Sequence, residues 1–180
     1  MQFCQLPANE PAARRFSQEL WLPFHRALEE ATETHELVDD IEQRLDEEVE
    51  FRLDLLDSES YEAVVAVDSE REEPSLTDPD VDLVGFITTD VEESPPVFDQ
   101  PDRLKIGDFY VREQHRGTGL ARELLDHAVE RARETGCPEL SLDVDDDNER
   151  ARGFYENVGF ETDRRALTAP VERVDRRGQD

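Results

Sequence analysis

The spacing of hydrophobic residues along the chain predicts helices and strands in mixed order. Apolar residues recur with a period near 3.6 over 11–33, 37–56 and 120–135, which is typical of helices with one buried face. Alternating or β-branched apolar runs predict strands over 61–67, 82–89, 106–111 and 140–144, and a short edge strand over 1–6. Two further short strands are expected over 160–165 and 167–174. The pattern therefore predicts an α/β protein.

A glycine-rich turn joins the strand 106–111 to the helix that follows it. Gly117 and Gly119 stand directly before that helix, whose first turn offers unpaired N–H groups and a partial positive charge. Because glycine has no Cβ, an anion can approach this backbone closely. A dinucleotide fingerprint needs a third small residue where Arg122 stands, and a Walker A loop needs a lysine, of which Lys105 is the only one. The turn predicts a phosphate site of another kind.

Two blocks of this sequence resemble the GNAT superfamily of N-acetyltransferases. The first is Gln114-x-x-Gly117-x-Gly119, and the second is Asn148-x-x-Ala151-x-x-Phe154-Tyr155-x-x-x-Gly159-Phe160. The resemblance is close over 105–165. Elsewhere only the number of predicted helices and strands agrees with the family. It implies one acetyltransferase domain over 1–175, with a central twisted mixed sheet flanked by helices on both faces. Residues 176–180 are expected to form a frayed tail.

The resemblance implies that the chain binds acetyl-CoA as a co-substrate. In this family the turn holds the pyrophosphate, and the pantetheine arm pairs with strand backbone at 109–111, where the fourth and fifth strands splay apart. Asn148 is expected to contact the arm or to cap the following helix, the second role being one that asparagine often fills. The residues expected to bind acetyl-CoA are Phe109, Tyr110, Val111, Arg116, Gly117, Thr118, Gly119, Leu120, Ala121, Arg122 and Asn148.

Candidates for proton transfer follow from the same resemblance. Tyr155 matches the family's general acid, a phenol near the CoA sulfur, although an aromatic on this apolar helix face also suits a core residue. Asp143 and Asp108 match acidic positions that serve as the base in some relatives. In so acidic a chain a given carboxylate is more often a surface charge, and a water chain is a third alternative.

The four histidines are assigned no catalytic part. His25, His35 and His127 are expected at solvated positions on helices, and His115 lies in the phosphate turn. None has a partner at metal-ligand spacing, so no metal is expected.

These residues predict direct acetyl transfer to a primary amine of a small molecule or a protein, in a ternary complex. Neither Cys4 nor Cys137 occupies a recognisable nucleophile position, which disfavours an acyl-enzyme. The alternative is a catalytically silent CoA-binding module with a regulatory or interaction role. The segments that form the acceptor site in this family, which are the first two helices, the proline-rich loop and the last hairpin, carry no motif here. The acceptor's identity is therefore left open, and so is the formation of a homodimer.

Charge adds an expectation about the environment. Aspartate and glutamate number 47 against 20 lysine and arginine, a net charge of −27, and the acids are scattered over every helix. This composition favours a halophilic, cytoplasmic protein with reduced thiols, and it argues against nucleic acid as a ligand. No apolar stretch is long enough for a membrane span, and the first residues do not resemble a signal peptide.

Overall fold

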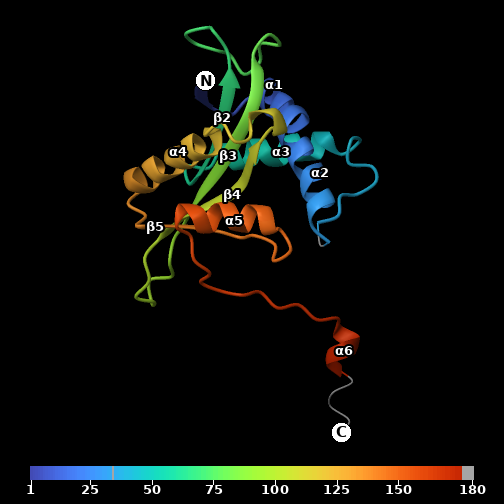
Figure 1. Ribbon diagram of the computed structural model, residues 1–180, viewed down its shortest axis with the longest axis vertical. Helices are drawn as coiled ribbons and strands as arrows, with labels where there is room; N and C mark the ends of the chain where they lie inside the picture. Colours follow the sequence, from blue (N-terminus) through green and yellow to red (C-terminus); the bar gives the residue numbers. More distant parts are fainter. Residues whose placement is uncertain (34, 176–180) are drawn as a thin grey trace. The chain divides into compact units, whose positions relative to one another are not determined.

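The computed structural model describes residues 1–33 and 35–175, so the tail predicted at 176–180 lies outside the described residues (Figure 1). The described chain divides between Asp147 and Asn148 into two compact units, and each is described separately. The single domain predicted over 1–175 stays a prediction. No described helix is long and apolar enough to cross a membrane.

A five-stranded mixed sheet forms the centre of the first unit. Its strands are β1 (Gln2–Gln5), β2 (Tyr61–Asp68), β3 (Asp82–Glu92), β4 (Arg103–Val111) and β5 (Glu139–Leu142), and they lie side by side in chain order. The first four pair antiparallel, whereas β5 pairs parallel to β4. The mixed sheet and the edge position of the first strand confirm the sequence-based prediction.

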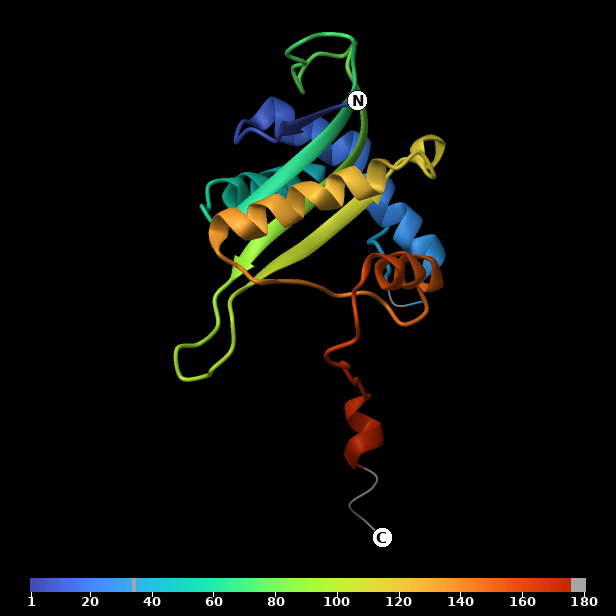
Figure 2. The ribbon, with the colours of Figure 1, turned by 60° about the vertical axis from the view of Figure 1, so that its left-hand side comes forward.

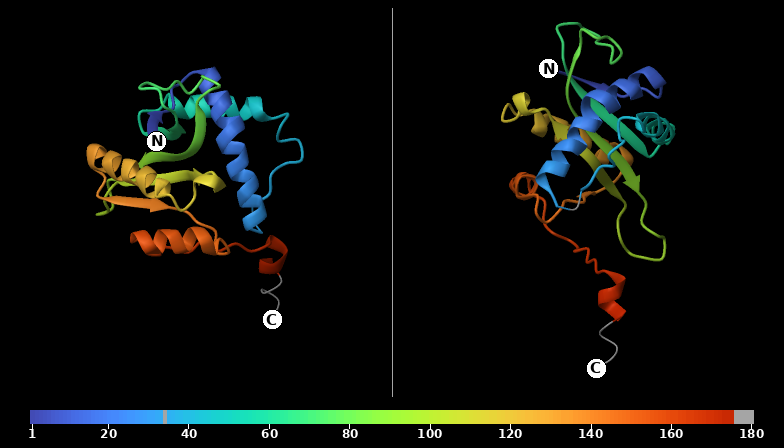
Figure 3. Two further views of the ribbon diagram at one scale, coloured as in Figure 1. Left: turned by 45° about the horizontal axis from the view of Figure 1, so that its top comes forward. Right: turned by 90° about the vertical axis from the view of Figure 1, so that its right-hand side faces the viewer.

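Helices cover both faces of this sheet (Figures 2 and 3). One face carries α1 (Glu10–Phe16), the π-helical turn η1 (Ser17–Trp21), α2 (Leu22–Ala31) and α3 (Leu45–Leu56), and the other carries α4 (Leu120–Thr135). A short 3₁₀ turn, η2 (Glu113–His115), precedes α4. The second unit holds α5 (Glu149–Val158) and α6 (Val171–Asp175).

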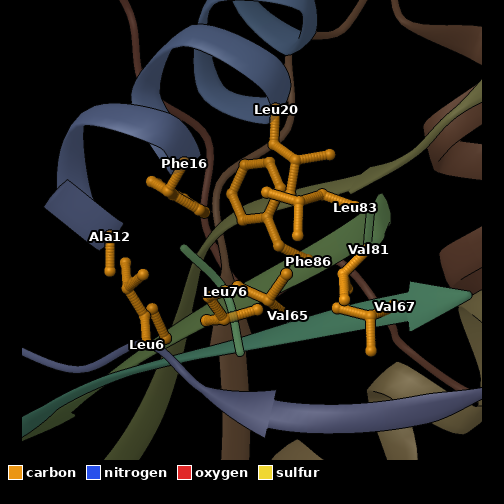
Figure 4. Close-up of a cluster of buried hydrophobic side chains, with 11 residues drawn as sticks. Leu6, Ala12, Phe16, Leu20, Val65, Val67, Leu76, Val81, Leu83 and Phe86 are labelled. Atoms are coloured by element: carbon orange, nitrogen blue, oxygen red, sulfur yellow. The ribbon is translucent and has the colours of Figure 1, made fainter. Parts of the chain in front are cut away.

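The main core lies between the sheet and the first helices (Figure 4). Phe16 of α1 meets Phe86 of β3 edge to face, with ring centroids 4.7 Å apart, and both side chains are fully buried. The other members of the cluster are small or branched apolar residues: Leu6, Ala12, Leu20, Ala63, Val65, Val67, Leu76, Val81 and Leu83. This packing fixes the first helices against β2 and β3.

The helix predicted over 11–33 is interrupted by a π-helical turn, because Pro23 has no N–H to bond to the carbonyl of Glu19. Leu22 instead donates to the carbonyl of Ser17, one residue further back. The Glu19 carbonyl accepts a hydrogen bond from Arg112 Nη2 at 3.1 Å. The interruption thereby ties the helix to the residue that follows β4.

Two parts of the sequence-based prediction are wrong. The helix expected over 37–56 begins only at Leu45, because residues 39–44 form turns in which backbone N–H groups bond to the carbonyl of Asp40. The strands expected over 160–165 and 167–174 are absent from the described residues. Leu167, Val171 and Val174 are exposed there, so the segment has no buried apolar face to hold a strand against a sheet.

Candidate functional site

A cavity of about 320 Å³ opens in the first unit, between the sheet and the first helices. This volume lies at the small end of the range for small-molecule sites, about 300–1,000 Å³. Helices η1, α2 and α3 and strands β2, β3 and β4 all contribute to it. Its lining residues are Trp21, His25, Glu48, Phe51, Arg52, Leu55, Tyr61, Thr88, Gly107 and Asp108.

A β-bulge in β4 forms the floor of the cavity. Ile87 pairs with Phe109 and Thr89 pairs with Ile106, so Gly107 and Asp108 together face the single residue Thr88. The Asp108 N–H donates to Thr88 Oγ1 at 2.8 Å, and a Cβ on Gly107 would lie 2.8 Å from that same oxygen. The bulge therefore needs glycine at 107, and it leaves Asp108 lining the cavity.

A buried arginine connects the acidic groups of the cavity. Arg52, with its side chain only 3% exposed, donates to Glu48 Oε1 through Nη2 at 2.8 Å and through Nε at 3.1 Å. Its Nη1 donates to the Tyr61 hydroxyl, and its Nη2 lies 3.6 Å from Asp108 Oδ2. One guanidinium thus lies near two carboxylates. When Glu48 and Asp108 are both ionised, the three side chains together carry one excess negative charge. Such a site attracts a cation.

Burial changes the proton affinities in this group. It raises the pKa of Glu48, although Arg52 acts in the opposite direction. It also raises the pKa of the Tyr61 phenol, which stays protonated at neutral pH and can accept the arginine's hydrogen bond as a neutral group.

Two histidines extend the site away from Asp108. His25 Nε2 lies 3.8 Å from Asp108 Oδ1, and His25 Nδ1 forms a 2.8 Å hydrogen bond with His35 Nε2. The His25 side chain is 13% exposed, so the expectation of a solvated position is wrong for this residue, and His35 follows the end of α2 rather than lying in a helix. Within the described part of the chain, His25 Nε2 is buried without a hydrogen-bond partner. Leaving such an atom unpaired costs about 1–3 kcal/mol.

The predicted phosphate turn has the backbone that its glycines allow. Gly117 and Gly119 have φ values of +76° and +97°, in the left-handed region that other residues rarely adopt. Gly119 is the N-cap of α4 and provides no side-chain cap, and a Cβ on Gly117 would meet no atom within 4 Å. The first turn of α4, which includes Leu120, Ala121 and Arg122, thus begins without a side-chain hydrogen bond from its N-cap residue.

Two side chains of this turn, those of Arg116 and Thr118, stabilise it through contacts with nearby backbone carbonyls and with Tyr110. Arg116 Nε donates to the carbonyl of Val111 at 3.0 Å, and its guanidinium lies over the Tyr110 ring at 6.0 Å. The Thr118 hydroxyl donates to the carbonyl of His115 at 2.7 Å. These contacts hold the turn against the end of β4.

Strand β4 runs beyond its parallel partner. The ladder with β5 ends at the pair Ile106 and Leu142, and β4 continues through Phe109, Tyr110 and Val111. Asp108 is the residue before this stretch. The cavity and the backbone expected to receive a pantetheine arm are consequently consecutive parts of one strand.

Asp143 occupies different surroundings from Asp108. It follows the last residue of β5, its side chain is 89% exposed, and its Oδ2 pairs with Lys105 Nζ at 2.9 Å. It does not line the cavity. The structure therefore brings Asp108, but not Asp143, together with the buried charges.

In the second unit, Asn148 and Tyr155 belong to α5. Asn148 Oδ1 accepts from the Ala151 N–H at 3.1 Å, the N-cap geometry expected of it. The Tyr155 ring contacts Phe154 and Phe160 edge to face, with centroids 5.5 and 5.6 Å away. Burial raises the pKa of Tyr155 to about 12, so its phenol keeps its proton at neutral pH.

The sequence analysis missed most of the cavity's charged and aromatic lining. Glu48 and Arg52 are separated by four residues, a spacing that brings side chains together on a helix, but many such pairs occur on exposed surfaces. Trp21 and His25 share the same spacing, and their rings lie 4.4 Å apart. Arg52 lies on the apolar face of α3, and a charged residue at such a position was the one sequence signal of a buried charged group. Among the described residues no group of three or more metal-ligating side chains is close enough to hold a metal.

Comparison with known proteins identifies the family. The sequence matches the acetyltransferase (GNAT) family over residues 19–160, more than three quarters of the chain. The chain therefore belongs to the GNAT family of acetyltransferases.

Curated relatives share a shorter part of the chain. A streptothricin acetyltransferase of Streptomyces lavendulae is 40% identical over 81 residues, which cover 45% of this chain and 40% of that protein. The peptidyl-lysine N-acetyltransferase YjaB of Escherichia coli (strain K12) is 35% identical over 77 residues, 43% of this chain and 41% of that protein. The matched region spans less than half the length of these relatives.

Solved structures share the fold over nearly the whole chain. A mutant of the BH1408 protein from Bacillus halodurans superimposes with a TM-score of 0.68 at 20% identity, covering 95% of this chain and 99% of that one. The acetyltransferase AAC(6′)-Iy, in complex with the bisubstrate analogue CoA-S-monomethyl-acetylneamine, has a TM-score of 0.63 at 15% identity, covering 94% and 96%. At these identities the likeness shows the fold alone.

The protonation state of Tyr155 is open to direct measurement. Tyrosinate absorbance should be followed after a rapid pH jump, before unfolding, in the wild type and in Tyr155→Phe. Because burial raises the pKa of Tyr155, the difference between the two curves should have its midpoint near about 12 rather than near the ordinary value of about 10. Tyr61→Phe serves as the control, since it removes another phenol and should leave this step in place. A midpoint near the ordinary value would contradict the burial of Tyr155.

Proposed function

We propose that this chain is an acetyl-CoA-dependent N-acetyltransferase that transfers an acetyl group directly to a primary amine in a ternary complex. The observation that carries the proposal is the position of Asp108. This carboxylate lines a cavity with excess negative charge, and it directly precedes the β4 residues expected to bind the pantetheine arm. One strand would thus hold both substrates. Residues 108 and 111 are about 10 Å apart at the usual strand rise of about 3.3 Å per residue.

The proposal for acetyl-CoA rests on the α4 turn and on β4. Acetyl-CoA supplies an activated acetyl group and a thiolate leaving group. The amides of the first turn of α4, opened by Gly117 and Gly119, suit a pyrophosphate. The strand backbone at 109–111 suits the amides of an extended arm by strand addition.

The proposal for the acceptor rests on the cavity's shape and charge. Trp21, Phe51 and Tyr61 offer aromatic walls, and Asp108 offers a carboxylate that Arg52 neutralises only in part. This combination suits a small cationic primary amine, or the end of a flexible side chain, with an apolar body beside the charge. The two curated relatives include one named for streptothricin and one for peptidyl-lysine, so the comparisons support both kinds of acceptor.

The side chains around the cavity support the proposal of direct transfer. Its lining includes no cysteine, serine or lysine that could carry the acetyl group. Tyr155 matches the family's general acid, and burial keeps its phenol protonated at neutral pH; we propose that it donates a proton to the departing thiolate. Asp108 holds the amine while the amine nitrogen attacks the acetyl carbonyl; the proton that the nitrogen loses on becoming an amide leaves to water, and Tyr155 regains its proton from solvent. In this scheme Asp143 remains a surface group paired with Lys105.

The activity is tested by following thiol release from acetyl-CoA with a panel of polyamines, aminoglycosides, amino acids and lysine peptides, with mass spectrometry of the products. We expect saturable, amine-dependent release and one acetyl group on the amine. Tyr155→Phe should lower kcat by about 10²-fold, at the low end for loss of a general acid, with little change in acetyl-CoA affinity. If the protein bound CoA but released no thiol with any amine of the panel, that result would support the alternative, a catalytically silent CoA-binding module.

The cofactor site is tested by two glycine substitutions at opposite ends of α4. Gly119 and Gly136 have φ values of +97° and +77°, so Gly119→Ala and Gly136→Ala impose similar backbone strain on the same helix. Only Gly119→Ala adds a methyl group at the proposed pyrophosphate site. Calorimetry with CoA should show binding weakened at least about tenfold, or about 1.4 kcal/mol, for Gly119→Ala alone. Equal affinities in the two variants would contradict the assignment.

A further inference from the structure

The contact between His25 and His35 joins the cavity to the region after α2. Their Nδ1 and Nε2 atoms are 2.8 Å apart, and the rings are nearly parallel. A hydrogen bond between two imidazole nitrogens needs one donor and one acceptor, so the two rings share a single proton at this contact. Two groups joined in this way exchange protons as a unit.

The other nitrogen of His25 is available to a ligand in the cavity. His25 Nε2 is buried and has no hydrogen-bond partner among the described residues, although His25 lines the cavity. It lies 3.8 Å from Asp108 Oδ1. A ligand nitrogen at an ordinary hydrogen-bond distance of about 2.8 Å can reach both atoms at once, because their separation is less than twice that distance. An ammonium group satisfies both, because it can donate to each acceptor and its positive charge pairs with the carboxylate.

The charges around the pair favour one added proton over two. Burial and the adjacent His25 ring lower the pKa of His35, while Asp145, Glu29 and Asp108 oppose this. Glu48 of α3 interacts with His25, and Arg52 provides the positive charge on the far side of Asp108. Acidic groups of α2, α3, β4 and the segment after β5 thus face the pair and can compensate one imidazolium. A second imidazolium in hydrogen-bond contact would be repelled by the first.

We propose that His25 and His35 form a two-histidine proton relay that removes the proton from an acceptor ammonium group held at Asp108. This inference rests on the proposed function and deepens it. His25 is the catalytic residue, because it contacts the substrate. His35 acts through His25 and is a positioning residue.

The relay conserves protons at each step. At rest, His25 carries its proton on Nδ1 and donates to His35 Nε2, and His35 carries its own on Nδ1. The ammonium N–H bond breaks as His25 Nε2 gains the proton; His25 Nδ1 passes its proton to His35 Nε2, and His35 Nδ1 releases one to solvent. The amine keeps the electron pair and is neutral. After product release His35 Nδ1 takes a proton from solvent, His35 Nε2 returns its proton to His25 Nδ1, and His25 Nε2 releases its proton to water in the emptied cavity, which restores the starting tautomers.

The kinetic test compares two acceptors of similar shape, one cationic at the assay pH and one with a weakly basic amine that is already neutral. His25→Gln should lower kcat/KM for the cationic amine by about 10²-fold, and His35→Gln by at least about tenfold, with loss of the acidic limb of the pH profile. The neutral amine should change less than about threefold. His127→Gln, on α4 and outside the cavity, is the matched control and should change neither.

Equal losses with both acceptors would show a structural role and overturn the relay. Undiminished activity of both variants with the cationic amine would also overturn it. If the wild type released no thiol with any amine, the proposed function itself would fail.

A measurement without turnover separates these failures. In an NMR titration, the His25 and His35 imidazole signals should move together in the wild type, and His35→Gln should shift the His25 transition. Independent titration of the two rings would overturn the relay whatever the activity. Because His35→Gln changes a half-exposed side chain, it keeps the test decisive if His25→Gln does not fold.

Discussion

The β-bulge at Gly107 and Asp108 is the constraint on which the rest of the site depends. Counted back from Tyr110, which pairs with Phe86, alternation puts Asp108 on the same face as Thr88, and the extra residue at the bulge shifts the register of the earlier part of β4 by one. The bulge is held by the hydrogen bond from the Asp108 N–H to Thr88, and the close approach of Gly107 to that hydroxyl excludes a side chain at 107. A single local irregularity therefore holds the backbone of Asp108 against Thr88 at the cavity while Phe109–Val111 continue along the sheet.

The helices above the sheet supply the partners that make this carboxylate useful. Pro23 forces the π-helical turn, and the freed carbonyl of Glu19 is bonded by Arg112 just after β4. Arg52, buried on α3, compensates Glu48 and part of the charge of Asp108. Buried charges are tolerated only when they are paired and hydrogen-bonded, and Arg52 provides this pairing; when Glu48 and Asp108 are both ionised, one negative charge is left over. The excess is the physical basis for an amine as ligand.

The sequence predicted the architecture better than the cavity. The strand, turn and helix around Gly117 and Gly119 were predictable because their signals are local: apolar periodicity, glycine at positive φ and the helix start. The N-cap role of Asn148 was predictable for the same reason. The C-terminal strands were wrongly predicted because an alternating pattern does not reveal whether a partner strand exists.

The cavity depends on contacts between residues far apart in the sequence. His25 was expected to be solvated, since nothing near it in the sequence indicates the approach of His35 and Asp108. Asp108 and Asp143 were equivalent candidates, because both lie within predicted strands of a chain rich in acids. Their surroundings in the structure differ. The Asp108 side chain is 26% exposed and lies near His25 and Arg52, whereas the Asp143 side chain is 89% exposed and pairs with Lys105.

The difference between these two carboxylates gives the most direct test of the account. The measurement is kcat/KM for one cationic amine acceptor in Asp108→Asn and Asp143→Asn, each an isosteric loss of one negative charge, with CoA affinity measured in parallel. The account predicts a loss of at least about tenfold for Asp108→Asn, most of it in KM for the amine. It predicts less than about twofold change for Asp143→Asn and unchanged CoA affinity in both. A larger loss for Asp143→Asn than for Asp108→Asn would contradict the central claim that the amine binds in the cavity at the bulge.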